Sequence, residues 1–223
     1  MTNEDLVQSL VSEGYLKTPA IIDAFLKIDR AQFVPEVEKR FAYRNEPLSI
    51  GFGQTISQPL TVAFMLELLE PQRGEHVLDV GAGSGWQSSL LAELVRPLDY
   101  DITQNTQKET KKATPYVVAI ERIPELAAIA KEHVDIYGFG SASIVAVYTG
   151  DGSRGFPDGA PYDKIIAAAA VHEIPDAWKE QVRVGGRIVA PIDDAIVLLE
   201  KKSADLFEER IFFGFSFVPL VTD

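Results

Sequence analysis

The 223-residue sequence has no cysteine, only three histidines and no long hydrophobic run. The lack of cysteine excludes disulfide bonds, thiolate nucleophiles and thiolate metal ligands. His76, His133 and His172 do not have the spacing of a ligand set, so we expect no metal site. The longest apolar run, residues 165–171, is far shorter than the ~20 residues that span a bilayer. Residues 1–5 are acidic and unlike the start of a signal peptide, so we expect a cytoplasmic protein without membrane contact.

Basic side chains are also scarce. The chain has 21 Lys and Arg against 33 Asp and Glu, which gives a formal net charge of -12. Nucleic-acid binding depends on many Lys and Arg contacts to phosphate, so we expect no nucleic-acid partner. Apolar residues make up 46% of the chain, enough for a substantial core, and the length suits one large domain or two small ones.

The first third of the chain is predicted to contain helices on both sides of a long loop. Apolar residues recur at helical spacing within 6–11 and 19–28, and Pro59 begins a third helix with an apolar face. Residues 30–58 show no dominant period and are interrupted by proline and glycine. We expect this stretch to be an ordered, functional loop. It has many apolar side chains to bury: Phe33, Val34, Phe41, Tyr43, Leu48, Ile50 and Phe52.

From residue 75 onward, predicted strands alternate with predicted helices. This alternation is typical of an α/β fold with a doubly wound, mostly parallel sheet, here with an antiparallel C-terminal edge. We expect Gly185-Gly186 to form a turn and the polar residues 97–115 to form a solvated surface insertion. The predicted strands are 77–80, 117–121, 143–147, 164–168, 187–191, 195–200 and 212–220, and the predicted helices are 87–95, 124–136 and 175–183.

A glycine-rich turn follows the first of these strands. Its sequence is Asp79-Val80-Gly81-Ala82-Gly83-Ser84-Gly85. A dinucleotide-binding fingerprint would place its third glycine at position 86, which is Trp86, and a phosphate-binding P-loop would require a Lys-Ser/Thr pair. The spacing G-x-G-x-G, with an acid two residues upstream, instead resembles motif I of class I S-adenosylmethionine-dependent methyltransferases, which have a Rossmann-like fold.

Two further acids end the next two predicted strands. Glu121 could accept hydrogen bonds from both ribose hydroxyls of a cofactor, a role that dinucleotide-type folds give to an acid ≈ 20 residues beyond the glycines. It lies 40 residues after Gly81 (121 − 81), but removal of the 19 residues 97–115 leaves 21. Asp151, within Gly150-Asp151-Gly152, could accept an adenine amino group, although Asp-Gly is also a common turn.

The segment before this core carries the most specific pattern. Pro47-Leu48-Ser49-Ile50-Gly51-Phe52-Gly53-Gln54-Thr55-Ile56-Ser57-Gln58-Pro59 strongly resembles the signature segment of the protein-L-isoaspartate O-methyltransferase family. Further segments match the family in the same order along the chain: 28–35, 77–85, 120–122, 150–152, 173–175, 184–187 and 217–220.

The resemblance implies an enzyme that methylates the α-carboxylate of L-isoaspartyl residues in damaged proteins and peptides. The ester then closes to a succinimide, which reopens partly as aspartate, and this starts repair. A carboxylate is already ionised at neutral pH and needs no general base, so orientation can supply most of the catalysis. By the resemblance, Thr55, Ile56 and Ser57 bind the substrate, and the Ser57 hydroxyl is the catalytic group that holds the carboxylate.

The implied cofactor is S-adenosyl-L-methionine, with S-adenosyl-L-homocysteine as product and no metal. Its expected binding residues are Asp79, Gly81, Gly83, Gly85, Glu121, Arg122, Asp151 and Gly152. We expect a monomer with one methyltransferase domain, residues 1–223. Residues 1–70 would form the N-terminal helices and the substrate-side loop, and 71–223 the cofactor-binding core with the insertion at 97–115.

Several alternatives stay open from the sequence. Ser57 or Gln58 precedes Pro59 and could simply cap the following helix. The protein could be a methyltransferase of the same scaffold that acts on another carboxylate or small acceptor, because Val221 stands where the family commonly has threonine and the insertion at 97–115 also departs from the family pattern. It could also be a cofactor-binding module without catalysis. We expect His172 to be a surface or packed residue, and Trp86 and Trp178 to be packing residues.

Overall fold

The computed structural model describes residues 1–97 and 115–222. The predicted insertion at 97–115 therefore lies almost entirely outside the described residues. Within the described part, no helix has the length and apolarity needed to cross a membrane. The helices are α1 (Asn3–Ser12), α2 (Pro19–Lys27), α3 (Pro59–Leu69), α4 (Trp86–Val95), α5 (Pro124–Ile136) and α6 (Asp176–Gln181), with the short 3-10 helices η1 (Arg30–Phe33), η2 (Glu36–Phe41), η3 (Gly152–Arg154) and η4 (Pro157–Gly159).

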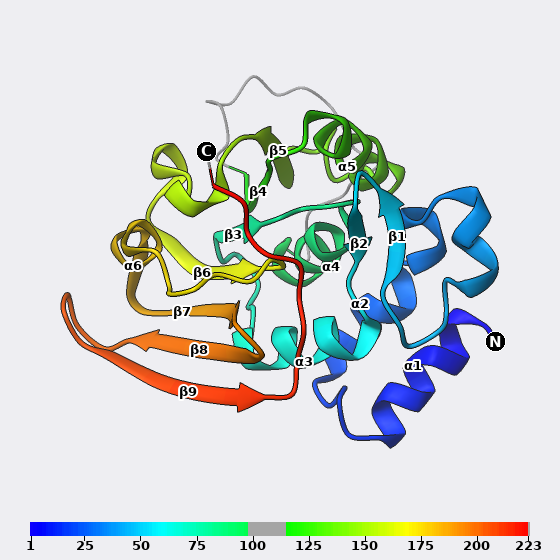
Figure 1. Ribbon diagram of the computed structural model, residues 1–223, viewed down its shortest axis with the longest axis horizontal. Helices are drawn as coiled ribbons and strands as arrows, with labels where there is room; N and C mark the ends of the chain where they lie inside the picture. The colour runs from blue at the N-terminus through cyan, green and yellow to red at the C-terminus, as the bar shows by residue number, and fades with distance from the viewer. Residues whose placement is uncertain (98–114, 223) are drawn as a thin grey trace.

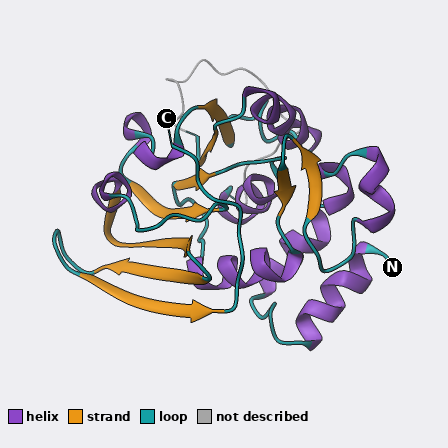
Figure 2. Ribbon diagram, viewed as in Figure 1, coloured by secondary structure: helices purple, strands orange, loops and turns teal. Residues whose placement is uncertain are grey.

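A seven-stranded sheet forms the centre of the molecule (Figure 1, Figure 2). Its strand order is β5-β4-β3-β6-β7-β8-β9. The first five strands in this order pair in parallel, and β8 and β9 are added antiparallel. This confirms the predicted α/β fold with an antiparallel edge. The strands are β3 (Val77–Val80), β4 (Val117–Glu121), β5 (Val145–Thr149), β6 (Tyr162–Ala167), β7 (Val182–Ile192), β8 (Ala195–Lys201) and β9 (Phe207–Phe213).

Alternate side chains of the parallel strands are buried in two apolar clusters, one on each face of the sheet. In β3, Val77 belongs to the cluster that contains residues of α1 to α5, and Leu78 belongs to the cluster of α6. Successive strand residues point to opposite faces, and both faces are covered, so these strands read as continuous apolar runs. Trp86 and Trp178 are 3% and 0% exposed, which confirms that both pack in the interior.

The prediction that residues 30–58 form a loop is wrong for part of that stretch. The segment contains η1, η2 and an antiparallel hairpin of β1 (Leu48–Gly51) and β2 (Gln54–Ile56). Only Leu48 and Ile50 of β1 are buried, and an alternation over four residues is too short to be recognised in the sequence. Phe52 does not join the core as expected, because it lies in the hairpin turn with φ 54° and is 54% exposed.

The last strand was also predicted in the wrong place. Residues 212–220 were expected to be a strand, but β9 ends at Phe213. This strand is at the sheet edge, where Glu208, Glu209 and Arg210 are exposed, so it has no apolar run. The apolar residues that follow form an irregular segment, which Ala170 holds through two backbone hydrogen bonds, with Val218 and Leu220.

Smaller differences occur at three other elements. β5 begins at Val145 rather than 143, because Ser143 has a φ of 57° and lies in a turn. Gly185-Gly186 is not a turn before a strand but part of β7, where the register against β6 shifts. The predicted helix 175–183 is shortened to α6, since Val182 already has extended backbone angles.

Candidate active site

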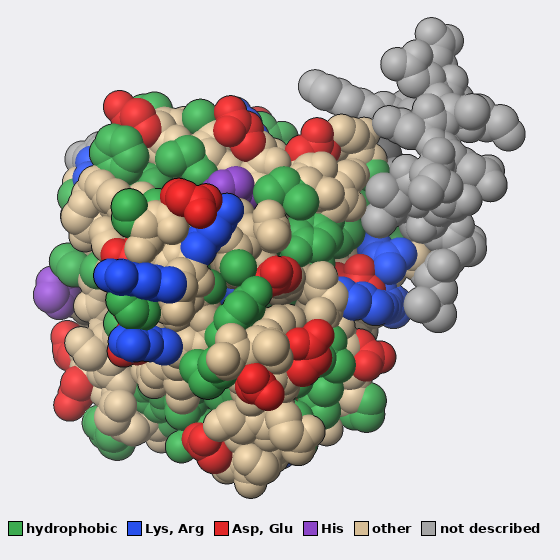
Figure 3. All heavy atoms as spheres, turned by 90° about the vertical axis from the view of Figure 1, so that its right-hand side faces the viewer, with side chains coloured by type: hydrophobic (Ala, Val, Ile, Leu, Met, Phe, Trp, Pro, Cys, Tyr) green, Lys and Arg blue, Asp and Glu red, His purple; other side chains and the backbone are tan. Residues whose placement is uncertain are grey.

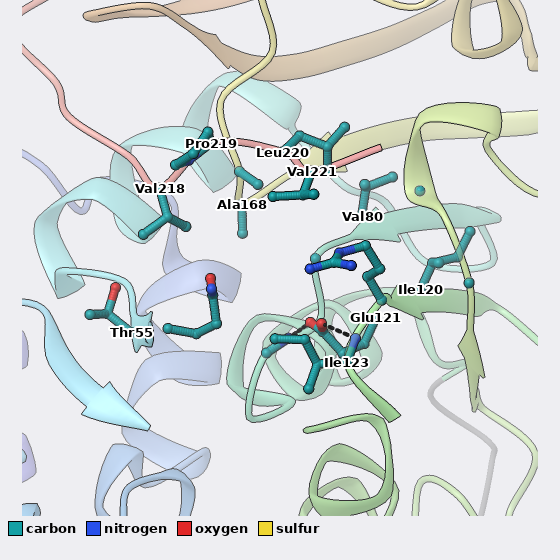
Figure 4. Close-up of a pocket in the computed structure, with 17 residues that line it drawn as sticks. Thr55, Val80, Ile120, Glu121, Ile123, Ala168, Val218, Pro219, Leu220 and Val221 are labelled. Atoms are coloured by element: carbon teal, nitrogen blue, oxygen red, sulfur yellow. Dashed lines mark hydrogen bonds between the residues drawn. The ribbon is translucent and has the colours of Figure 1, made fainter. Parts of the chain in front are cut away.

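The carboxyl ends of β3, β4 and β6 open into one cavity, together with the loop after β5 (Figure 4). Ligands of open α/β sheets bind at this edge, because the loops that follow parallel strands meet there. We name it the strand-end cavity. It is lined by Gln54, Thr55, Val80, Gly81, Gly83, Ile120, Glu121, Arg122, Ile123, Gly150, Gly152, Ala168, Ala169, Val218, Pro219, Leu220 and Val221.

The glycine-rich turn forms the wall of the strand-end cavity between β3 and α4. Gly81 and Gly83 line the cavity and have φ angles of 82° and 55°, in the left-handed region that favours glycine. Gly85 faces the other way: a Cβ there would lie 3.1 Å from the carbonyl oxygen of Ala130 in α5. Gly85 therefore serves the packing of α4 against α5 and is not among the residues that line the cavity; its contact with a cofactor stays a prediction.

Asp79 also lies behind the turn rather than in the strand-end cavity. It is 0% exposed, and its two carboxylate oxygens accept hydrogen bonds from Ser88 Oγ (2.6 Å) and Gln87 Nε2 (2.7 Å) in the first turn of α4. Burial raises the pKa of Asp79 to about 6, although both hydrogen bonds act in the opposite direction. Asp79 thus ties the end of β3 to α4, and it is not among the residues that line the strand-end cavity.

Glu121 occupies the position that its spacing predicts, at the end of β4 with its carboxylate in the strand-end cavity (Figure 4). One carboxylate oxygen accepts the backbone N–H of Gly83 and the other that of Ile123, both at 2.9 Å. The side chain therefore fixes the glycine turn as well as facing the cavity. A carboxylate oxygen can accept two hydrogen bonds, so each still has capacity for a ligand hydroxyl. Arg122 lines the same cavity.

The loop after β5 contributes its glycines to the strand-end cavity rather than its acid. Gly150 and Gly152 line the cavity, whereas the Asp151 carboxylate accepts the backbone N–H of Ser153 at 2.9 Å and begins η3. A Cβ on Gly152 would come within 2.4 Å of a methyl group of Val80, so only glycine fits. Asp151 itself is not among the lining residues, and its adenine contact stays a prediction.

A second hollow, which we name the Ser57 groove, joins the strand-end cavity. The two share Thr55, Ala168 and Val218. A smaller cavity between them is lined by Thr55, Ile56 and Ser57 on one side and by Gly81 and Gly83 on the other. The Ser57 groove is lined by Tyr15, Pro47, Thr55, Ser57, Gln58, Leu60, Thr61, Ala168, Phe213, Gly214, Phe215, Ser216, Phe217 and Val218.

The structure does not use Ser57 to cap α3. The N-cap residue is Gln58, which makes no side-chain capping hydrogen bond. The backbone N–H of Leu60 is instead bound by Oδ1 of Asn45 at 3.0 Å, and the Asn45 carbonyl accepts a hydrogen bond from the Gln58 side chain. No sequence signal could identify Asn45, because it lies 15 residues from Leu60 along the chain. Within the described residues, the Ser57 hydroxyl has no hydrogen-bond partner and remains available.

The C-terminal segment closes the strand-end cavity on the side opposite Glu121 (Figure 4). Val221 lines this cavity, whereas Thr222 lies in a separate depression with His172 and Asp193. Thr222 therefore does not take the place of the threonine that Val221 replaces. The His172 side chain is fully exposed, as expected for a surface residue. Among the described residues, no group of three His, Asp or Glu could hold a metal ion.

Comparison with known proteins finds one family over the whole chain. The model of the protein-L-isoaspartate(D-aspartate) O-methyltransferase family matches residues 1–223. The chain is 40% identical to the protein-L-isoaspartate O-methyltransferase of Ignicoccus hospitalis, over 98% of this chain and 97% of that protein. It is also 40% identical to the enzyme of the same name from Methanopyrus kandleri, over 98% of this chain and 90% of that protein.

Solved structures agree with this comparison. A protein-L-isoaspartate O-methyltransferase structure matches with a TM-score of 0.81 and 26% identity, over 98% of this chain and 65% of that chain. A crystal structure of a Plasmodium falciparum protein in complex with S-adenosyl-L-homocysteine matches with a TM-score of 0.81 over 100% of both chains. Its identity of 20% makes it a likeness of fold.

Proposed function

Because the chain belongs to the protein-L-isoaspartate(D-aspartate) O-methyltransferase family, we propose that it transfers a methyl group from S-adenosylmethionine to the α-carboxylate of L-isoaspartyl residues. The substrates are damaged proteins and peptides, and the ester starts their repair through a succinimide. The observation that carries this proposal is the junction of the Ser57 groove with the strand-end cavity at Thr55 and Ala168. A methyl donor in the cavity and a carboxylate in the groove would meet there.

The residues of the strand-end cavity fit the proposed cofactor. Glu121 offers acceptor capacity for two ribose hydroxyls, and Val80, Ile120 and Ile123 offer apolar surface for an adenine ring. Gly81, Gly83, Arg122 and Gly152 complete the direct contacts that we propose. Asp79, Gly85 and Asp151 contribute from behind the wall, because they hold its loops in place.

The chemistry requires orientation more than acid–base groups. S-adenosylmethionine, when bound, supplies a methyl group on a positively charged sulfur. The acceptor carboxylate is ionised at neutral pH, so no side chain has to remove a proton. Thr55, Ile56 and Ser57 hold the substrate, and the Ser57 hydroxyl donates one hydrogen bond to the carboxylate. A neutral donor such as this hydroxyl orients the reacting oxygen but leaves most of its nucleophilicity.

The wider setting follows from charge and chain organisation. We propose one domain in which residues 1–70 supply the acceptor side and 71–223 the donor side, and which works as a cytoplasmic monomer. The net charge of -12 disfavours a nucleic-acid partner, although the face in Figure 3 has both acidic and basic side chains. The proposed reaction needs no metal.

The test is methyl transfer from labelled S-adenosylmethionine to a matched set of peptides. One peptide contains isoaspartate, the second contains aspartate at the same position, and the third is the isoaspartyl peptide with its α-carboxylate converted to an amide. We expect base-labile label only in the first. Equal labelling of the aspartyl peptide or of free carboxylic acids would indicate another acceptor. Cofactor binding without any transfer would indicate a non-catalytic module.

A further inference from the structure

Arg30 is a buried cation whose partners are backbone carbonyl groups. It lies in η1 and is 0% exposed. One terminal nitrogen donates to the carbonyl oxygens of Ala42 (2.7 Å) and Arg44 (3.4 Å). The other donates to those of Glu46 (3.0 Å) and Ser57 (3.1 Å). One guanidinium group therefore joins the segment before the hairpin to Ser57, the residue that follows it.

The charge of Arg30 is poorly compensated for so deep a position. Among the described residues no carboxylate forms a salt bridge with it, the charge of Glu46 only partly offsets the effect of burial, and its Nε has no hydrogen-bond partner. Its carbon Cζ lies 5.3 Å from the ring centre of Trp86. Burial lowers the pKa of Arg30 to about 10, so the group stays charged at neutral pH. Burial of a charge costs free energy of desolvation. The planar guanidinium group of arginine is suited to holding its hydrogen-bond partners in a fixed geometry rather than to filling space.

The hydrogen bond to Ser57 also sets the direction of the next N–H group. In a planar trans peptide, the carbonyl and the N–H point in opposite directions. Because the Ser57 carbonyl points to Arg30, the N–H of Gln58 points away from it. Both Ser57 and Gln58 line the groove, and no acceptor among the described residues binds this N–H. Pro59 has no N–H, and that of Leu60 is bound by Asn45.

We propose that Arg30 is a positioning residue for methyl transfer. It holds the Ser57 carbonyl from the interior and thereby places two donors, the Ser57 hydroxyl and the Gln58 N–H, toward one acceptor carboxylate. Its buried positive charge also polarises the peptide between Ser57 and Gln58, which strengthens that N–H as a donor. This inference rests on the proposed function, because it concerns the acceptor of that reaction.

A purely structural role is separated from positioning by a matched control. Lys201 is also a buried cation, 8% exposed, whose ammonium donates to the backbone carbonyls of Lys179 and Val182. It lies on β8, on the other side of the molecule from the β1–β2 hairpin (Figure 1). Lys201→Met and Arg30→Met each remove a buried cation from backbone carbonyls, but only the second does so behind Ser57.

The experiment measures kcat and KM for an isoaspartyl peptide, calorimetric Kd for the cofactor, and thermal unfolding. We expect Arg30→Met to lower kcat by roughly 10- to 100-fold, as for a small misplacement at a reacting centre. Arg30→Lys, which keeps the charge and one donor direction, is expected to fall between this variant and the wild type. Cofactor Kd stays within about twofold. Lys201→Met lowers the melting temperature and leaves kcat unchanged.

A double-mutant cycle decides the case even if Arg30→Met does not fold. Arg30→Lys is made in the wild type and in Ser57→Ala, and its effect on kcat is expected to be much smaller in the second background. Equal effects in both backgrounds, wild-type kcat in folded Arg30 variants, or a parallel loss of cofactor binding would each overturn the inference. If the wild type does not methylate the isoaspartyl peptide at all, the proposed function itself fails.

Discussion

Replacement of Ser57 by alanine separates a catalytic role from a capping role. The Ser57 hydroxyl is bound by no described residue, and the backbone N–H that a cap would satisfy is already bound by Asn45. We therefore expect Ser57→Ala to change the free energy of unfolding by less than about 0.5 kcal/mol, as for substitutions away from specific interactions. Loss of the orienting hydrogen bond is expected to lower kcat by roughly 10²-fold.

Asn45→Ala is the matched variant for the cap. It removes the side-chain oxygen that binds the Leu60 N–H at 3.0 Å and keeps the backbone carbonyl that binds the Gln58 side chain. Loss of such a cap costs about 1 kcal/mol, which corresponds to a fall of roughly 2–4 °C in melting temperature for a chain of this size. The effect on kcat is expected to be small, because the backbone of Ser57 is held independently of this side chain.

Ser57→Thr completes the series. Threonine keeps a hydroxyl but adds a methyl group beside the glycine turn, so we expect normal stability with lowered kcat. The assays are methyl transfer to an isoaspartyl peptide, calorimetric cofactor binding and thermal unfolding, all on the same preparations. Cofactor Kd should stay near the wild-type value in all three variants. A fully active but less stable Ser57→Ala protein would refute the reasoning and identify Ser57 as a structural residue.

Three further predictions concern the donor side. Glu121→Gln should weaken S-adenosylmethionine binding by about 1.5–3 kcal/mol in calorimetry, because an amide loses the charge-assisted bonds of the carboxylate. Gly152→Ala should lower both melting temperature and cofactor affinity, because its Cβ would meet Val80 at 2.4 Å. The pKa of Asp79 is about 6 in the folded protein and near 3.8 in the unfolded chain. Between these values the unfolded state binds fewer protons, so this group lowers stability by up to about 3 kcal/mol as pH rises. Urea unfolding from pH 4 to 8 should show a flatter pH dependence for Asp79→Asn, and an unchanged dependence would contradict this.

The donor side could be predicted from the sequence because its signals are local or depend on one spacing. The glycine turn follows a buried strand directly, and Glu121 has the expected distance once residues 97–115 are removed. What the pattern could not tell is which side of the wall each motif residue faces. Asp79 and Gly85 belong to the motif, yet one binds α4 and the other packs on α5. A motif shows that a residue type is required at a position, but the reason can be packing or loop structure rather than contact with the ligand.

The acceptor side was less predictable because its contacts join residues that lie far apart in the sequence. Arg30 reaches Ser57, 27 residues away, and Asn45 reaches Leu60, 15 residues away. Neither pairing follows a helical or strand period, so no local pattern could reveal it. The hairpin of β1 and β2 has only four and three residues, too few for an alternation to be recognised. The family resemblance predicts a substrate-binding role for Ser57, but the hydrogen bond that holds its backbone is visible only in the structure.

The two halves of the proposed site therefore depend on different kinds of interaction. Glu121 holds the glycine turn through one backbone N–H, and a Cβ on Gly83 would lie 3.4 Å from Ile50 of the hairpin, so the halves nearly touch at the turn. The donor side is fixed by strand order and by Glu121. The acceptor side is fixed by Arg30 and Asn45, neither of which belongs to the seven-stranded sheet. Changes in the segment 30–58 should consequently affect turnover of the acceptor more than affinity for the cofactor, and changes around Glu121 should do the reverse.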